Sequence, residues 1–247
     1  MLHEDHLKIV IKNTFSAVSA TYARKKEGAF TSSGVSRLVF PRKSAQSGGD
    51  IRVSEQEVRF IFVEELVKYL ATPDGEEWDV HYSVETPTVH NYAFPKNAKP
   101  IHYGTDKQGR SANIDLTIHD NTGMRVALIE FKHGHDFQAM NKDFLKLAKE
   151  PDAKYRYFIG LLSSSDNKTV TRLQEKIQSK DSYLDENTRL IYYSLEHDLD
   201  MPKVVIGEEL LEKYHYKDFT EIEYNGKKYS YPELSKVSGV PRKLLYQ

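Results

Sequence analysis

Residues 111 to 133 constrain the fold of this chain most, because they carry the pattern of a β-hairpin that sets two acidic residues against each other. Residues 113–118 alternate polar with apolar side chains, residues 121–123 read Asn-Thr-Gly, and residues 126–129 form a short apolar run. Alternation and an apolar run are typical of strands, and Asn-Thr-Gly is typical of a turn. With the turn centred on Thr122 and Gly123, Asp115 lies opposite Glu130.

Strand alternation places Glu130 and Lys132 on the same face, so two carboxylates and an ammonium converge. Paired carboxylates repel, and burial increases the cost, unless Lys132 or a bound cation offsets it. Mg²⁺ prefers oxygen ligands and takes one or two carboxylates, so Asp115, Glu130 and the Phe131 carbonyl would suit it, with Mn²⁺ as a substitute. The alternative is an amphipathic hairpin with a surface ion pair of little energetic value. Apolar residues on both faces of 126–131 favour the buried site.

Asp115, Glu130 and Lys132 together resemble the core motif of the PD-(D/E)XK, or restriction-endonuclease-like, nuclease superfamily. The resemblance covers roughly residues 54–162, and Ile114 stands where the motif's proline would be. It implies an α/β fold with a restriction-endonuclease-like core, a mixed β-sheet flanked by helices. It also implies Mg²⁺-dependent hydrolysis of DNA, with Asp115 and Glu130 binding the metal and Lys132 serving the attacking water. A restriction, anti-phage defence or mobile-element endonuclease is the corresponding biological setting.

A helix is expected before the hairpin, because residues 54–70 carry an apolar stripe at helical spacing. The family places a glutamate on this helix. Glu55 lies on the same face as Val58 and Phe62, so it is the better candidate, and Glu57 is expected to pair with Ser54 in a capping box. A simple role in favouring the helix dipole remains open for both acids.

A second helix is expected over residues 137–148, followed by an apolar strand at 157–162, which makes a strand-helix-strand crossover. In relatives, a Gln or Lys on this helix faces the phosphate, which nominates Gln138 and Lys142. Arg110 and Asn113 lie beside Asp115 in the sequence and are candidates for phosphate contact. A solvated surface is the alternative for each of these residues.

Composition sets the limits of this interpretation. The chain has 247 residues, of which 39% are hydrophobic and 29% charged, as expected of a globular protein. It has no cysteine, which excludes disulfides and thiolate chemistry and fits a cytoplasmic setting. No apolar run reaches membrane length. The net charge of -1 means that any attraction to DNA has to come from a local patch.

The C-terminal tail carries the sequence patterns of a small module appended to the core. Residues 223–229 contain an Asn-Gly hairpin signal, and residues 230–246 follow a helix, glycine turn, basic helix plan that resembles a helix-turn-helix module. Arg242 and Lys243 are its candidate DNA-binding residues. The expected organisation is therefore an N-terminal helix and basic loop (1–53), a nuclease-like core (54–215) and a small appendage of a β-hairpin and helices (216–247).

Two other functions remain open at the level of sequence. The same sheet would also serve as a non-catalytic module that binds nucleic acid or a nucleotide. A nuclease for RNA or single strands is equally compatible, because the motif concerns the phosphate that these polymers share. A homodimer is left open, since no segment marks a dimer face.

Overall fold

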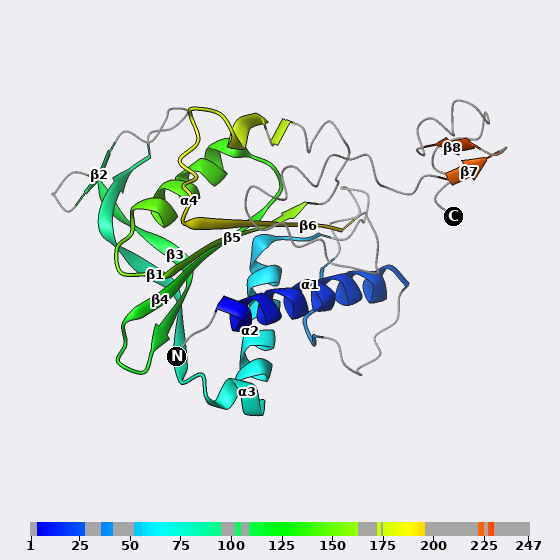
Figure 1. Ribbon diagram of the computed structural model, residues 1–247, viewed down its shortest axis with the longest axis horizontal. Coiled ribbons are helices and arrows are strands. Elements are labelled where there is room, and N and C mark those ends of the chain that lie inside the picture. Colours follow the sequence, from blue (N-terminus) through cyan, green and yellow to red (C-terminus); the bar gives the residue numbers. More distant parts are fainter. Residues whose placement is uncertain are drawn as a thin grey trace. The chain divides into compact units, whose positions relative to one another are not determined.

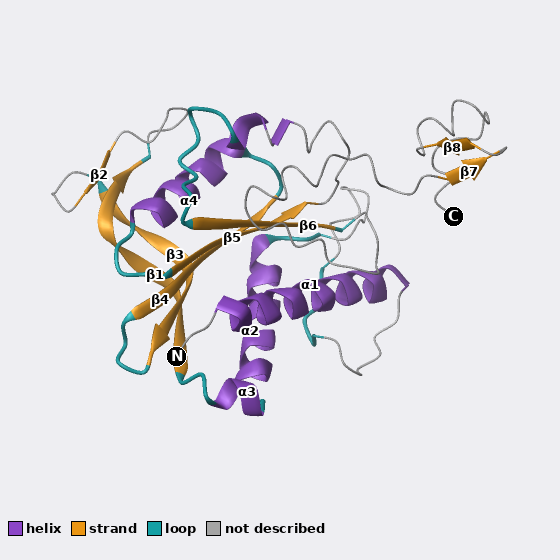
Figure 2. Cartoon of the chain, in the orientation of Figure 1, coloured by secondary structure: helices purple, strands orange, loops and turns teal. Residues whose placement is uncertain are grey.

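The computed structural model describes residues 4–27, 36–41, 52–94, 102–104, 109–162, 172–173, 175–195, 222–224 and 227–229. The chain divides into two compact units, Met1–Gly207 and Glu208–Gln247. The first is an α/β unit built around one mixed sheet (Figures 1 and 2). Its elements are α1 (Glu4–Glu27), α2 (Glu55–Leu70), α3 (Pro73–Glu76), β1 (Val80–Ala93), β2 (His102–Gly104), β3 (Arg110–Asp120), β4 (Arg125–His133), α4 (Phe137–Lys149), β5 (Tyr155–Leu162) and β6 (Thr188–Ser194).

The sheet has the strand order β2-β1-β3-β4-β5-β6, with the three-residue β2 at one edge. The pairs from β2 to β4 are antiparallel, whereas β4, β5 and β6 run parallel. In the predicted hairpin, Leu116 pairs with Ile129 and Ile118 with Ala127, which confirms the predicted register over these residues. The expected pair of Asp115 and Glu130 lies just beyond the last pair of the ladder. The crossover from β4 through α4 to β5 is also confirmed.

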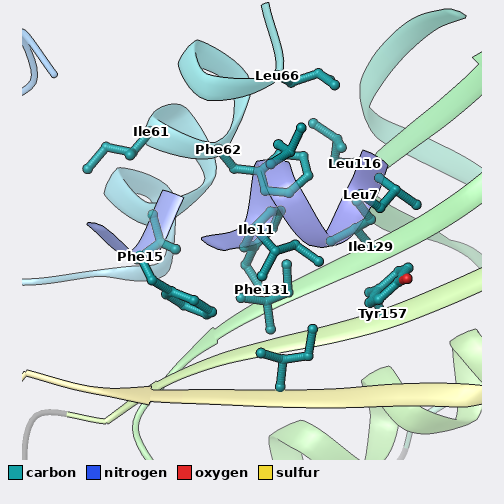
Figure 3. Close-up of a cluster of buried hydrophobic side chains, with 14 of the residues drawn as sticks. Leu7, Ile11, Phe15, Ile61, Phe62, Leu66, Leu116, Ile129, Phe131 and Tyr157 are labelled. Atoms are coloured by element: carbon teal, nitrogen blue, oxygen red, sulfur yellow. The ribbon is translucent and has the colours of Figure 1, made fainter. Parts of the chain in front are cut away.

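One face of the sheet is covered by α1 and α2, which cross each other (Figure 1). An apolar stripe on α1, including Leu7, Ile11 and Phe15, meets Phe62 and Leu66 of α2 over the strands (Figure 3). The N-terminal helix itself was expected from the sequence, and its i, i+4, i+8 apolar spacing gives it the face that packs here. The strands contribute Leu116, Ile129, Phe131 and Tyr157 to the same core.

The opposite face of the sheet is covered by α4. Met140, Phe144 and Leu147 pack against Leu128 and Phe158, as their helical spacing predicts. Residues 172–173 and 175–177 are also helical, and the buried side chains of Leu173 and Ile177 join this second core. Helices on both faces explain why the parallel strands read as continuous apolar runs.

Strand β1 is long and irregular. The sequence breaks near its prolines predict several short segments, but residues 80–93 form one strand whose register against β3 shifts between Pro87 and Asn91. Proline is tolerated in a strand at such an irregularity. A second irregularity lies at Glu85, whose φ of 49° is left-handed, and the pairs Val84–Leu116 and Thr86–Ile114 flank it. The backbone of β1 is therefore distorted directly beside Asp115.

In the second unit, β7 (Ile222–Tyr224) and β8 (Lys227–Tyr229) pair antiparallel, which confirms the predicted hairpin. The predicted helix-turn-helix at 230–246, with Arg242 and Lys243, lies outside the described residues. Among the helices that the structure describes, none has the length and apolar character needed to cross a membrane.

Candidate active site

The candidate site lies at a fork where β3 and β4 stop pairing. Their last paired residues at this end are Leu116 and Ile129. Beyond them, Asp115 Oδ2 accepts a hydrogen bond of 2.8 Å from the Phe131 backbone N–H. A side-chain carboxylate thus takes the place that a backbone carbonyl has in a continuous ladder. This contact fixes Asp115 at the point where the strands diverge.

Glu130 is buried at the fork and faces α4. Its side chain is 2% exposed, and its Oε1 lies 2.5 Å from Lys146 Nζ. Lys146 also lies 3.0 Å from Asp143 Oδ1 and donates a 2.8 Å hydrogen bond to the Asn113 carbonyl. Burial raises the pKa of Glu130, and the Lys146 ammonium opposes that rise. Burial would lower the pKa of Lys146, but Glu130 and Asp143 outweigh it and raise the pKa, so Lys146 is the cation of the pair.

Lys132 lies between acidic residues of α2 and α4, which are on opposite faces of the sheet. Its Nζ is 3.4 Å from Glu55 Oε2 on α2 and 3.7 Å from Asp143 Oδ2 on α4. Burial would lower the pKa of Lys132, but the charges of Asp143 and Glu55 outweigh it and raise the pKa. The amine is therefore a cation held by one acidic residue from each side.

Arg59 of α2 approaches the fork from the other side. Its NH1 lies 3.5 Å from Asp115 Oδ1 and also forms an ion pair with Glu85, the residue of β1 with left-handed backbone. Burial raises the pKa of Asp115, and the Phe131 amide and the charges of Lys146 and Arg59 work against this rise. Asp115 is thus bracketed by a guanidinium, an ammonium and an amide.

The structure brings together four of the residues that the sequence nominates. Asp115, Glu130 and Lys132 share the fork, and Glu55 reaches Lys132 from α2. Glu57 turns the other way, to the Ser54 hydroxyl and to Arg52 at 3.7 Å. The expected capping box is not formed, because Ser54 donates to the Glu57 carboxylate and accepts no hydrogen bond from the helix amides.

Other nominated residues lie away from the fork or at its rim. Arg110 and Gln138 are exposed, at the beginnings of β3 and α4. Lys142 lies over the Phe94 ring, 5.9 Å from its centroid. Asn113 is exposed, and its side chain reaches Glu85 at 3.5 Å while its carbonyl accepts from Lys146. The structure therefore places Lys146, one turn beyond Lys142, at the position next to the carboxylates.

Ion pairs, and the electrostatic interaction of Asp115 with Glu130 and Lys146, join the charged side chains at the fork into one network: Glu55, Arg59, Glu85, Asp115, Glu130, Lys132, Asp143 and Lys146. Four of them were not predicted as site residues: Arg59, Glu85, Asp143 and Lys146. A signal existed for three of them. Asp143 is three residues after Met140 and four before Leu147, so it lies within the apolar stripe of α4, and Lys146 follows it by one turn. Arg59 follows Glu55 by four residues and shares its face of α2. Glu85 carries no signal, because its place depends on a backbone irregularity.

The described part of the site offers few side chains that could act as metal ligands. Among the described residues, no group of three or more His, Cys, Asp and Glu side chains has an arrangement that could hold a metal ion. Asp115 and Glu130 remain as a pair of carboxylates beside the Phe131 backbone. Glu130 Oε1 lies 2.5 Å from the Lys146 ammonium, and Asp115 and Glu130 interact as like charges in the same site. Two carboxylates that repel each other beside a backbone carbonyl are oxygen donors that suit an ion such as Mg²⁺, which takes only one or two carboxylates and completes its shell with water.

Comparison with known proteins adds no identification: no protein-family model matches the chain, and neither the curated proteins nor the solved structures give a significant match.

Proposed function

We propose that this chain is a Mg²⁺-dependent nuclease that hydrolyses DNA phosphodiester bonds, with a restriction-endonuclease-like core. The observation that carries the proposal is the meeting of Asp115, Glu130 and Lys132 at the fork of β3 and β4. The sheet supports it, since an antiparallel hairpin continues into a parallel crossover through α4. This combination matches both the motif and the order of elements that the resemblance implies.

The proposed division of labour follows from the contacts. Asp115 and Glu130, with the Phe131 carbonyl, would hold the metal ion, which supplies Lewis acidity and a more acidic bound water. Lys132 would orient that water or stabilise the charge that develops on the phosphate. Glu55 acts through Lys132, because its carboxylate lies 3.4 Å from the amine and limits its rotamers. Arg59 is near enough to Asp115 to offer a second positive group to a phosphate.

Substitution of the three central residues tests the proposal. Asp115→Asn, Glu130→Gln and Lys132→Met are each expected to abolish Mg²⁺-dependent cleavage of plasmid DNA, with loss of at least about 10²-fold. Lys68→Met serves as a matched control, because Lys68 pairs with Glu65 on α2, outside the network. Cleavage of closed circular DNA would identify an endonuclease, and EDTA should stop it.

Folding of each variant is checked by circular dichroism and urea unfolding. Cleavage retained by all three folded variants would refute the site. Parallel assays with linear DNA, single-stranded DNA and RNA identify the polymer that is cleaved. They are needed because a site that acts on the phosphate does not by itself distinguish these polymers.

A non-catalytic nucleic-acid or nucleotide-binding module is the second candidate, and one observation favours it. Arg59, Lys132 and Lys146 already neutralise much of the acidic charge at the fork without a metal. Calorimetric titration with Mn²⁺ separates the two functions. A wild-type chain that binds DNA with strong salt dependence but takes up no Mn²⁺, alone or with DNA, would favour the binding module.

A further inference from the structure

Lys146 is surrounded by oxygen atoms in the way that a bound cation would be. Three oxygens from three elements lie around its Nζ: Glu130 Oε1 of β4 at 2.5 Å, Asn113 O of β3 at 2.8 Å and Asp143 Oδ1 of α4 at 3.0 Å. The side chain is 11% exposed. An ammonium that is removed from water requires such compensation, and here Glu130 and Asp143 provide it. A second metal ion would need the same two carboxylates as ligands.

The summed charge of the network indicates how many metal ions the site can hold. Its members are linked through ion pairs and through the mutual interaction of Asp115, Glu130 and Lys146. Five carboxylates and three cationic side chains take part: Glu55, Glu85, Asp115, Glu130 and Asp143, with Arg59, Lys132 and Lys146. When all are ionised the net charge is -2. One divalent ion balances that charge, whereas two would leave an excess of positive charge in a partly buried site.

We propose that the Lys146 ammonium takes the place of a second metal ion, so that this chain binds a single divalent ion between Asp115 and Glu130. Asp143 then positions the two lysines and is not a metal ligand. This inference rests on the proposed function, because it takes the metal to be the one that the nuclease site holds. It goes further in fixing the number of ions and the role of Asp143.

The contacts of Asp143 support this assignment. Its two oxygens are directed to different amines, Oδ1 to Lys146 at 3.0 Å and Oδ2 to Lys132 at 3.7 Å. Asp115, by contrast, accepts from the Phe131 amide with Oδ2, and its Oδ1 faces the Arg59 guanidinium at 3.5 Å. Asp143 is therefore the carboxylate that lies between the two lysines, whereas Asp115 contacts no lysine at ion-pair distance among the described residues.

The test counts metal ions without using activity. The full chain is titrated with Mn²⁺, alone and with a short duplex whose phosphates are replaced by phosphorothioates, and bound ions are counted by calorimetry and by the electron paramagnetic resonance of free Mn²⁺. One ion per wild-type chain is expected. Asp143→Asn should keep that number, and Asp115→Asn, its matched control at the other side of the fork, should bind the ion at least about tenfold more weakly than Asp143→Asn because it loses a ligand.

Each outcome bears on the inference. Two ions per wild-type chain, or an affinity of Asp143→Asn as low as that of Asp115→Asn, would overturn it and leave the nuclease proposal standing. No bound ion under either condition would overturn both, and would favour the non-catalytic module. Lys146→Ala adds an independent check, because removal of the ammonium should allow a second, weaker Mn²⁺ ion to bind. If that variant does not fold, the counts for the wild type and Asp143→Asn decide.

Discussion

At the scale of single residues, the most consequential contact is the buried pair of Glu130 and Lys146. Neither side chain has appreciable exposure, and each is the closest opposite charge to the other. Burying such a pair adds little net stability, but removal of one partner leaves the other charge uncompensated. The pair therefore makes the fold dependent on residues that the proposed chemistry also needs.

Lys146→Met is expected to lower the free energy of unfolding by about 3 kcal/mol, because Glu130 would remain buried without its cation. Urea unfolding at neutral pH measures the change. Lys176→Met is the control, since Lys176 is an exposed helical lysine outside these ion pairs and should change stability by no more than about 0.5 kcal/mol. The double variant with Glu130→Leu should recover part of the loss. Equal stability of Lys146→Met and the wild type would show that the pair is not coupled.

The residues of the site divide into those that local pattern reveals and those that it does not. Asp115, Glu130 and Lys132 follow from the alternation of a hairpin, whose register is set by its turn. Arg59 and Asp143 are single charges on amphipathic helices, and a solvent-facing role is the default for such positions. Their place at the site depends on how α2 and α4 cross the sheet, which is a tertiary property.

At the scale of elements, Glu150 at the end of α4 connects the helix to the irregular part of β1. Its carboxylate accepts hydrogen bonds from the amides of Val89 and His90 and from the Tyr92 hydroxyl, and it pairs with Arg125 at 2.9 Å. These contacts satisfy backbone groups that the register shift of β1 leaves without ladder partners. The periodic patterns that predicted the helix and strands contain no sign of this connection.

Stability should depend on pH through Glu150. Burial alone would raise its pKa, but the hydrogen bonds from Val89, Arg125 and His90 outweigh it and lower the pKa below the ordinary value. Its contribution is therefore present above the pKa of the unfolded chain, about 4.3, and is lost as the pH falls through the lower folded-state value. Glu150→Gln should be less stable than the wild type at pH 7, and this difference should shrink on acidification. A difference that is constant in urea unfolding from neutral to acidic pH would contradict the assignment.

Gly160 lets three parallel strands pack at the level of Lys132. It pairs with Lys132 on β4 and Tyr192 on β6, and a Cβ at this position would overlap the Tyr192 ring. Gly160→Ala is expected to cost about 1 to 3 kcal/mol in urea unfolding. Adding Tyr192→Leu, with Tyr192→Leu alone as control, should make the alanine less costly, because the two sites are coupled. Additive losses would show that the ring moves aside freely.

At the scale of the whole molecule, the chain consists of two compact units that divide at residue 207. The type and order of the main helices and strands of the first unit could be predicted from the sequence, because helical and alternating periodicities identify them. The union of residues 80–93 into one strand was not, since prolines in the sequence favour breaks there. The sequence also could not show that α1 packs on α2, which depends on tertiary burial of its apolar stripe.

A chain that ends at Gly207 should keep the urea midpoint of the first unit, because the cores on both faces of the sheet lie within that unit. The truncated chain should also retain Mn²⁺ binding, as every residue of the network precedes the cut. A large drop in midpoint would show that the second unit supports the first. The same chain tests the predicted DNA-binding role of the tail, since it removes Arg242 and Lys243 together.

The left-handed backbone of Glu85 has a consequence for any effort to raise the thermostability of this protein. A non-glycine residue in that conformation costs about 1 to 2 kcal/mol, which glycine would avoid. Glutamate at this position nevertheless keeps a carboxylate on Arg59, next to Asp115. Selection for thermostability alone would therefore favour glycine here, and would release the Arg59 guanidinium from its place beside the proposed site.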